Sequence, residues 1–315
     1  MKSLRVSLIG VGIAALAFTG VALSQQGGPP EQAGPPELNM VGHKVNPHDA
    51  AVTAGSIGQM TPAITYHNGP VMTTPNVYVI WYGNWNQTNG SDTPSGQSLV
   101  NTFLTGVSGS PYLKINTTYN NVPTGNILVA GSITDAYSQT ARLTDAKVQA
   151  VVNRAVAAST PNHLPVDPNG IYFVLSSTDV SENSGFCTKY CGWHTAGTIA
   201  GSNLKYSFVG NANRCLSGCA AQTTSPNNNP GVDGMISVIA HELEEAITDP
   251  NPRSGWADAN GAENADKCAW TFGSALSTAP NGSKYNMTLG GLNFLIQRNL
   301  SAIDSKCYVA LNGAQ

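Results

Sequence analysis

The sequence predicts an α/β fold, a single domain in which helices pack against a mixed sheet. Segments 76–82 and 170–175 are apolar throughout and rich in β-branched and aromatic residues, as in strands buried on both faces. Segments 98–107 and 144–158 instead carry apolar residues at helical spacing. Strands that alternate with helices favour layers of helix on sheet, and roughly 250 residues is an acceptable size for one domain.

The remaining elements follow in order along the chain. The first buried strand ends at Gly83, and the helix at 98–107 is amphipathic through Leu99 and Phe103. Thr144 is a suitable N-cap for the second helix because its hydroxyl can accept a free backbone N–H. A longer helix is expected at 233–248, stopped by Pro250. Shorter strands are expected at 112–119, 126–133, 205–209, 285–288, 294–297 and 307–310.

Residues 1–24 are typical of a secretory signal peptide. Lys2 and Arg5 precede an apolar stretch at 6–21, and small residues follow at 22–24. A membrane anchor is the alternative, but the stretch is short for a span and no stop-transfer pattern follows. We therefore expect a secreted protein, extracellular or periplasmic, with no stable membrane insertion once the signal is removed.

Composition divides the rest of the chain and limits its partners. Residues 25–61 are rich in Gly and Pro and are expected to form a flexible linker or pro-region, followed by the folded domain at 62–315. Charged residues are 10% of the chain, the net charge is −3, and no basic stripe occurs, so a nucleic-acid partner is not expected. The sequence gives no indication of an oligomeric state.

Six cysteines in an exported protein predict three disulfides. The simplest pairing is local, with Cys187 to Cys191 and Cys215 to Cys219, which leaves Cys268 for Cys307. Two Cys-x-x-x-Cys pairs could instead hold a structural zinc ion. Disulfides are favoured because the expected compartment is oxidising.

The expected helix at 233–248 carries the most informative motif, His241-Glu-Leu-Glu-Glu245. Residues four apart share one helix face, so His241 and Glu245 point the same way. The arrangement resembles the zinc-protease motif His-Glu-x-x-His, with glutamate replacing the second histidine. The surrounding helix is apolar on several sides and should be buried, so its ionisable groups need partners such as a metal. A solvated acidic helix face is the alternative.

A catalytic zinc needs three protein ligands and an open position for water. Glu263 or Asp266, shortly after the helix, would complete the set, and a solvated acidic loop is the alternative there. Glu242 would act as general base on metal-bound water. His194 would serve as a ligand, as a transition-state donor or as a structural side chain. Zn²⁺ is the expected cofactor, and Ca²⁺ is the alternative because the site is rich in carboxylates.

Several segments resemble one known family. They are YHNGPV at 66–71, NVYVIWYGNW at 76–85, GFCTKYCGWH at 185–194, CLSGC at 215–219, DGMISVIAHEL at 233–243 and ENADKC at 263–268. Together they resemble the EXORDIUM, or phosphate-induced protein 1, family. The resemblance implies a secreted protein and no particular substrate, because no biochemical activity is firmly attached to that family. The Gly/Pro-rich leader and the short, bacterial-looking signal depart from the family, so a role in plant growth is not carried over.

The leading hypothesis is a secreted zinc-dependent hydrolase of metallopeptidase type with a zincin-like active helix. An extracellular peptide or a cell-wall polymer would be its substrate. A glycosidase that uses two of the carboxylates is also compatible with the sequence. The alternative from another class is a non-catalytic extracellular or wall-associated protein with a structural metal site.

Overall fold

A five-stranded mixed sheet lies at the centre of the chain in the computed structural model, which describes residues 62–122 and 124–311. The predicted signal peptide (1–24) and linker (25–61) lie outside the described residues. The four strands that run parallel are joined by one antiparallel strand at the sheet edge, β7. In sheet order the strands are β3 (Leu128–Asp135), β2 (Asn76–Tyr82), β5 (Gly170–Ser176), β8 (Ser202–Gly210) and β7 (Gly192–Ile199).

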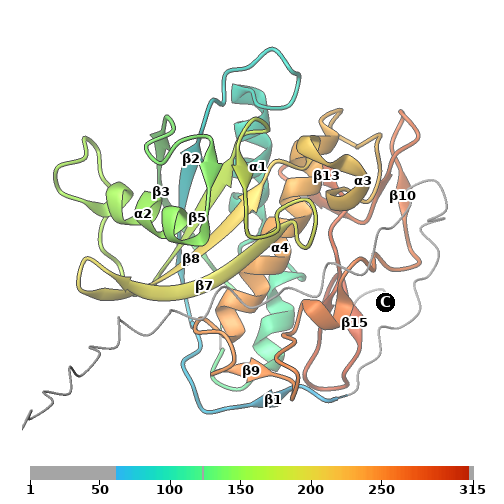
Figure 1. Ribbon diagram of the computed structural model, residues 1–315. Helices are drawn as coiled ribbons and strands as arrows, with labels where there is room; N and C mark the ends of the chain where they lie inside the picture. The colour runs from blue at the N-terminus through green and yellow to red at the C-terminus, as the bar shows by residue number, and fades with distance from the viewer. Residues whose placement is uncertain (1–61, 123, 312–315) are drawn as a thin grey trace, which may run out of the picture. The chain divides into compact units, whose positions relative to one another are not determined.

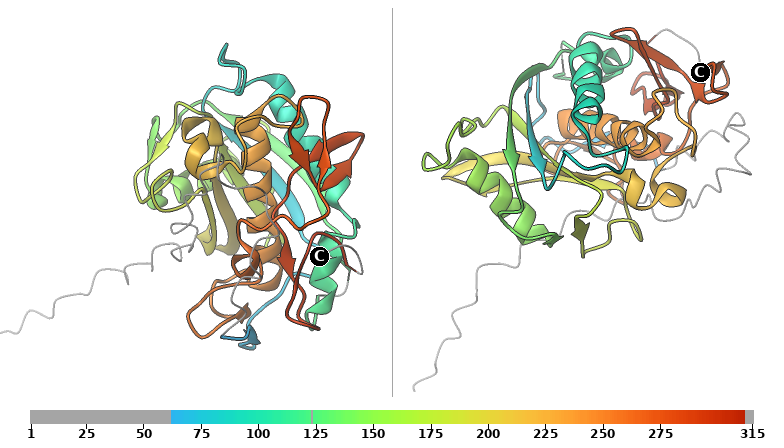
Figure 2. Two further views of the ribbon diagram at one scale, coloured as in Figure 1. Left: turned by 90° about the vertical axis from the view of Figure 1, so that its right-hand side faces the viewer. Right: turned by 90° about the horizontal axis from the view of Figure 1, so that it is seen from above.

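Helices cover both faces of this sheet (Figures 1 and 2). Helix α2 (Asp145–Val156) lies on one face, and α1 (Pro94–Val107) and α4 (Pro230–Thr248) lie on the other. Strands covered on both sides lose almost all contact with water, which accounts for the unbroken apolar runs of β2 and β5. The predicted mixed α/β architecture with packed helices is confirmed.

The helix starts agree with capping chemistry more closely than with apolar periodicity. Thr144 caps α2 as predicted, because its side chain accepts the Lys147 N–H at 3.4 Å. Helix α1 starts at Pro94, before the predicted 98, and Thr93 caps it by accepting the Gly96 N–H at 3.0 Å. Proline is favoured in the first turn of a helix because its missing N–H would have no partner there.

The predicted strand at 112–119 is wrong, since a 3-10 helix, η2 (Leu113–Thr118), occupies this segment. Hydroxyl groups satisfy its backbone locally. Ser110 accepts the Leu113 N–H, and Thr117 and Thr118 donate to carbonyls three residues back. Such side-chain bonds offer the backbone an alternative to a strand ladder.

Strand β7 was not predicted, and it is the strand that carries His194. Glycines at 192 and 197 dilute its apolar pattern, so neither strand nor helix periodicity stands out. Its pairing with β8 nevertheless runs the full length of β7. A Cβ on Gly192 would lie 2.6 Å from Val238 Cγ1 of α4, so glycine permits the close approach of strand and helix.

Five two-stranded ribbons accompany the central sheet in the described residues, and three of them lie within residues 277–308. The predicted strands near 285–288, 294–297 and 307–310 are present in part but are shorter or shifted. The pairs are β1 (Thr65–Tyr66) with β9 (Trp256–Ala257), β4 (Arg142–Leu143) with β6 (Ser181–Glu182), β10 (Ser277–Thr278) with β11 (Lys284–Tyr285), β12 (Met287–Leu289) with β13 (Leu292–Phe294), and β14 (Asn299–Leu300) with β15 (Cys307–Tyr308).

The three disulfides join Cys187 to Cys215, Cys191 to Cys219, and Cys268 to Cys307. The predicted local pairing of the first four cysteines is wrong, and so is the alternative of a four-cysteine zinc site. Two neighbouring bridges instead tie the segment before β7 to the short helix α3 (Leu216–Cys219). The predicted bridge from Cys268 to Cys307 is confirmed. Three disulfides are consistent with an extracellular protein.

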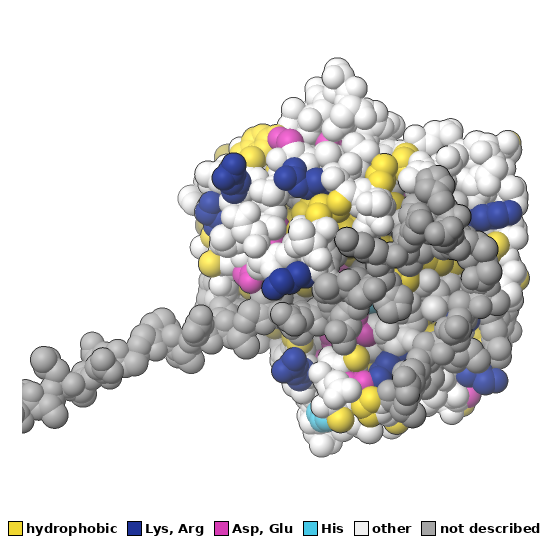
Figure 3. Space-filling view, turned by 45° about the vertical axis from the view of Figure 1, so that its right-hand side comes forward, with side chains coloured by type: hydrophobic (Ala, Val, Ile, Leu, Met, Phe, Trp, Pro, Cys, Tyr) yellow, Lys and Arg dark blue, Asp and Glu magenta, His cyan; other side chains and the backbone are white. Residues whose placement is uncertain are grey.

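The surface fits the composition. Lys and Arg side chains are scattered over the face drawn in Figure 3 instead of gathering in a stripe. Within residues 62–122 and 124–311, no helix has the length and apolar character needed to cross a bilayer.

Candidate metal centre

Helix α4 is the element that carries the predicted motif, and it is buried on every side. Asn229 caps it by accepting the Val232 N–H at 3.2 Å, and Pro230 opens the first turn, so it starts three residues before the predicted 233. The sheet covers one side of α4, and α1 with α3 and η2 covers others. All residues from Gly231 to Thr248 are buried. This confirms the predicted burial and excludes the alternative of a solvated acidic helix face.

Six ionisable side chains from three separate segments meet beside α4. We call them the His–carboxylate cluster: His194 from β7, His241, Glu242 and Glu245 from α4, and Glu263 and Asp266 from the segment that enters the 3-10 helix η4 (Asp266–Cys268). Five of them are at most 1% exposed, and the Asp266 side chain is 8% exposed. The structure therefore brings together every residue that the sequence suggested for the site.

His241, Glu245 and Asp266 form one metal-ligand triad within this cluster, which we call the α4 triad. His241 Nε2 lies 3.0 Å from Glu245 Oε1 and 3.5 Å from Asp266 Oδ1. Ligand atoms on a tetrahedral zinc ion, with bonds of about 2.0–2.1 Å, are about 3.3 Å apart. The spacing therefore fits three atoms that share one small cation.

His194, Glu245 and Glu263 form a second triad, which we call the β7 triad. His194 Nδ1 lies 3.6 Å from Glu245 Oε2, and His194 Nε2 lies 3.6 Å from Glu263 Oε1. The triad atoms lie within 4.8 Å of one another. The sequence left Glu263 and Asp266 as equal choices for His241, and the fold places Asp266 with His241 and Glu263 with His194.

Several buried atoms of the cluster have no hydrogen-bond partner, which is costly for polar groups away from water. Both ring nitrogens of His241 are among them, although one lies close to a carboxylate. The unpartnered carboxylate atoms of the cluster are Glu242 Oε1, Glu245 Oε2, Glu263 Oε1 and Asp266 Oδ1. A bound cation would satisfy such atoms without requiring any of them to donate a proton.

Charge in the cluster is unbalanced as well. Within the described residues, the ion pairs of the cluster's four carboxylates involve only its two histidines, with no lysine or arginine. Burial raises the pKa of Glu242 to about 7, despite the lowering effect of His194. Burial also raises the pKa of Asp266, and that of Glu263 well above its usual value. A buried carboxylate without a lysine or arginine partner is stabilised either by taking up a proton or by binding a metal ion.

Hydrogen bonds from the backbone hold the ligand side chains in place. The Asp266 N–H donates to Glu245 Oε1 at 3.0 Å, and the Glu263 N–H donates to Asp266 Oδ2 at 3.1 Å. The Cys268–Cys307 disulfide and the buried Lys267–Asp258 ion pair anchor the same segment. These contacts fix the positions of the Glu245 and Asp266 carboxylates. Hydrogen bonds to the ligand side chains have the same effect in metal sites.

Sequence reasoning missed Asp249, the residue after α4. Its backbone carbonyl lies 3.2 Å from His194 Nε2, and its carboxylate accepts the N–H groups of Arg253 and Gly255. Asp249 thus both ends helix α4 and orients His194. The signal was present, because an Asp-Pro pair directly after a helix is typical of a turn built on the aspartate side chain.

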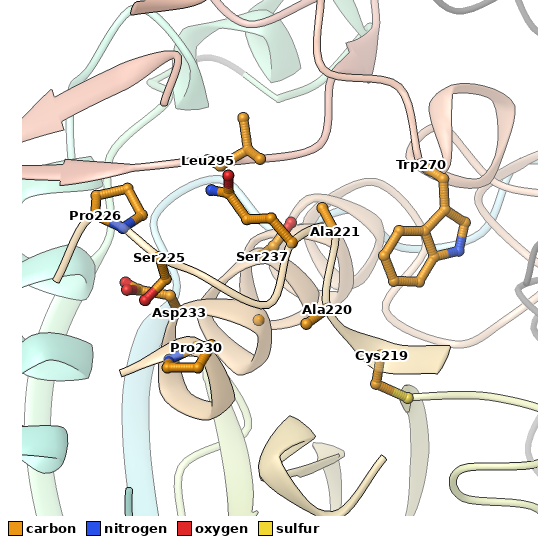
Figure 4. A pocket seen from close by; sticks show the side chains of 12 residues that line it. Cys219, Ala220, Ala221, Ser225, Pro226, Pro230, Asp233, Ser237, Trp270 and Leu295 are labelled. Carbon is orange, nitrogen blue, oxygen red and sulfur yellow. The ribbon is translucent and has the colours of Figure 1, made fainter. Parts of the chain in front are cut away.

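A pocket lies at the other end of α4 (Figure 4). Asp233 and Ser237 of α4 line it together with Trp270 and Leu295. No residue of the His–carboxylate cluster lines this pocket. The His–carboxylate cluster and the pocket are therefore separate features beside the same helix.

Comparison with known proteins is consistent with the sequence motifs. The model of the phosphate-induced protein 1 conserved region matches residues 64–309. Protein EXORDIUM-like 5 of Arabidopsis thaliana is 29% identical over 309 aligned residues, covering 83% of this chain and 82% of the relative. Protein EXORDIUM-like 3 of the same plant is 30% identical, covering 78% and 82%. Protein PHOSPHATE-INDUCED 1 of Nicotiana tabacum is 25% identical, covering 71% and 80%. The matched region includes the whole cluster.

Proposed function

This chain belongs to the phosphate-induced protein 1 family, and we propose that it is a secreted protein organised around a buried divalent cation. The cation is held by the α4 triad, His241, Glu245 and Asp266. The observation that carries the proposal is that His241 Nε2 and Asp266 Oδ1, buried at ligand spacing from Glu245 Oε1, lack hydrogen-bond partners. Burying them without a cation would cost free energy that hydrogen bonds do not return.

Zinc is the metal that suits these donors best. Zinc accepts both imidazole nitrogen and carboxylate oxygen as ligands in sites of four ligands, whereas calcium takes six to eight oxygen ligands. His241 contributes a ring nitrogen, and its distances to the carboxylate oxygens of Glu245 and Asp266 are close to those between ligand atoms on a tetrahedral zinc ion. The proposal is therefore Zn²⁺, with Ca²⁺ as the competitor to be measured.

Burial favours a structural role for the cation. Catalytic zinc sites keep a position for water, whereas structural sites are closed by four protein ligands, so a fourth ligand such as Glu242 would have to join the α4 triad. Glu242, His241 and Glu245 are each 0% exposed. A cation at the α4 triad would fasten α4 to the disulfide-anchored segment that carries Asp266.

Metal analysis of the secreted full-length protein tests this proposal. We expect zinc in the purified wild type and, in Asp266→Asn, the loss of the cation held at the α4 triad. Glu244→Gln is the matched control, because Glu244 is also buried on α4 but accepts from Asn299 Nδ2 at 2.7 Å outside both triads. Protein free of divalent metal, or an Asp266→Asn variant that keeps full zinc content, contradicts the proposal.

A metal-dependent hydrolase is the second candidate, and Glu242 favours it. Its Oε1 is unpartnered beside the α4 triad, and a pKa of about 7 suits a general base at neutral pH. An antiparallel edge strand beside the helix would also suit an extended peptide, in the manner of strand addition. A peptide or a cell-wall polymer would be the substrate, and α4 would act as a zincin-like active helix.

The test of this candidate is hydrolysis of unstructured protein and of wall polysaccharide by the zinc-loaded protein. The hydrolase requires turnover in the wild type and its loss in Glu242→Gln with zinc retained. Turnover that persists in Glu242→Gln removes this residue from the reaction. Zinc-loaded protein without turnover leaves the structural role.

A further inference from the structure

We propose that the cluster holds a second divalent cation, in the β7 triad, so that Glu245 bridges two metal ions. This inference rests on the proposed function, because it adds a cation to the one held by the α4 triad. The β7 triad comprises His194, Glu245 and Glu263 and shares only Glu245 with the first.

The two oxygens of Glu245 face different histidines. Oε1 lies 3.0 Å from His241 Nε2, and Oε2 lies 3.6 Å from His194 Nδ1. Oε2 has no hydrogen-bond partner, and Glu263 Oε1 on the far side of the same triad also has none. A carboxylate with one oxygen toward each ligand set is the arrangement of a bridging ligand between two metals, which are about 3.5–4 Å apart in such centres.

His194 is oriented as metal-bound histidines are. His194 Nε2 lies 3.2 Å from the Asp249 carbonyl and 3.6 Å from Glu263 Oε1. Its Nδ1 faces Glu242 and Glu245, so carboxylates lie beside both ring nitrogens of His194. A ligating histidine commonly donates its other N–H to a backbone carbonyl, which fixes the tautomer and the ring plane. An imidazole that only filled space would not need carboxylates at the opposite nitrogen.

Charge supports two cations over one. The cluster holds four carboxylates, and the described residues supply no lysine or arginine partner to any of them. Once metal binding has displaced their protons, one dication offsets two of the four negative charges. A second dication offsets the remainder without any further positive group, which matters at a site that water does not reach.

The test counts zinc in the intact, full-length protein and repeats the count after chelation and reloading with Zn²⁺. We expect two equivalents in the wild type. Glu263→Gln should keep one equivalent, because it removes a ligand of the β7 triad alone, and Asp266→Asn should also keep one. Glu244→Gln should keep two. Reloading with Co²⁺ should raise the visible absorption in two steps in the wild type and in one step in either single variant.

The outcomes separate the two proposals. A wild type with one equivalent, lost in Asp266→Asn and kept in Glu263→Gln, overturns the second cation and leaves the first. A wild type with no divalent metal overturns both. The number of zinc equivalents in the wild type does not depend on whether a variant folds. It therefore still decides between one and two cations if Glu263→Gln is unstable.

Discussion

Glu245 differs from the other three carboxylates of the cluster in the direction of its pKa shift. Burial tends to raise its pKa, but His241 and His194 outweigh burial and lower it to about 2. Its neighbour Glu242 has a pKa of about 7. Glu245 is therefore ionised and able to bind a cation at any ordinary pH, whereas Glu242 gains or loses its proton near neutrality. Two residues of one helix thus have different chemical uses.

The metal-free protein should lose stability as the pH rises from 5 to 8. Glu242 has a folded pKa above its ordinary value, so the stability present at low pH is lost as the pH rises through about 7. Although burial lowers them, the neighbouring carboxylates raise the pKa values of His194 and His241 well above the usual value, and the contribution of these residues declines in the same direction. Glu245 is constant in this window because its pKa is lowered to about 2. Thermal unfolding in chelator at both pH values measures the effect.

Added Zn²⁺ should reverse this trend, because metal ligands must be deprotonated and affinity rises with pH. The gain in melting temperature on adding zinc should be larger at pH 8 than at pH 5. Glu242→Gln should flatten the pH dependence of the metal-free protein, since it removes one of the titrating groups. A zinc gain that is equal at both pH values would argue against carboxylate and imidazole ligands.

The site residues were within reach of sequence reasoning, but their grouping was not. A histidine and a glutamate one helical turn apart, in an apolar helix, indicate a buried ligand pair from spacing alone. The division of Glu263 and Asp266 between two histidines depends on where β7 lies, and that is a tertiary contact. The role of Asp249 depends on it in the same way.

At the scale of elements, the contact between β7 and α4 positions His194. Gly192 makes this contact possible, because any side chain there would meet Val238 Cγ1 and the Phe208 carbonyl. We predict that Gly192→Ala costs about 1–3 kcal/mol, as overpacking does, and lowers zinc content at the β7 triad. Urea unfolding and metal analysis measure the two effects.

Gly131→Ala on β3 is the control for this substitution. A Cβ there would be 3.4 Å from the nearest atom, Leu164 Cδ2, which is an ordinary contact. We expect a change within about 0.5 kcal/mol and unchanged zinc. If Gly192→Ala matched the control in both measurements, the close approach would not position the site.

The Cys268–Cys307 disulfide should matter to the metal more than the other bridges do. It closes a separation of 39 residues, for which chain entropy gives about 4 kcal/mol, and it anchors the segment that carries Asp266. Replacing both cysteines with serine should weaken zinc binding roughly 10–100-fold, the range seen when outer supports of metal sites are removed. Zinc titration of the two-serine variant measures this.

Removal of Cys187–Cys215 is the matched control, because the neighbouring Cys191–Cys219 bridge keeps the same two segments joined. Zinc affinity should then stay near the wild-type value. Equal weakening by both substitutions would show that the bridges act through overall stability and not through the segment carrying Asp266.

Helices and strands could be predicted from the sequence where burial determines the residue pattern. They could not be predicted where side-chain bonds to the local backbone or pairing with a distant strand determine the structure. Strands β2 and β5 are covered on both faces, so their apolar runs are unbroken, and helix α4 is buried along almost its whole length. The η2 helix depends on serine and threonine bonds to its own backbone, and β7 depends on pairing with β8. The cross-paired cysteines near β7 likewise follow from two loops meeting in space, which residue spacing does not specify.

For the whole molecule, the cluster joins segments that are far apart in the sequence. His194, the motif of α4 and the segment at 263–266 come from the sheet edge, the central helix and the C-terminal region. A cation that binds only the folded chain adds its binding free energy to stability, about 4 kcal/mol when it is present at 1,000 times its dissociation constant. The fold would then depend on the metal as well as on its apolar core.

The most direct test of the cation is a crystal structure of the secreted protein with anomalous scattering measured on both sides of the zinc absorption edge. The proposed structure predicts an anomalous peak about 2.0–2.2 Å from His241 Nε2, Glu245 Oε1 and Asp266 Oδ1. A well-ordered map with no anomalous peak among these atoms, or with only water there, would contradict it.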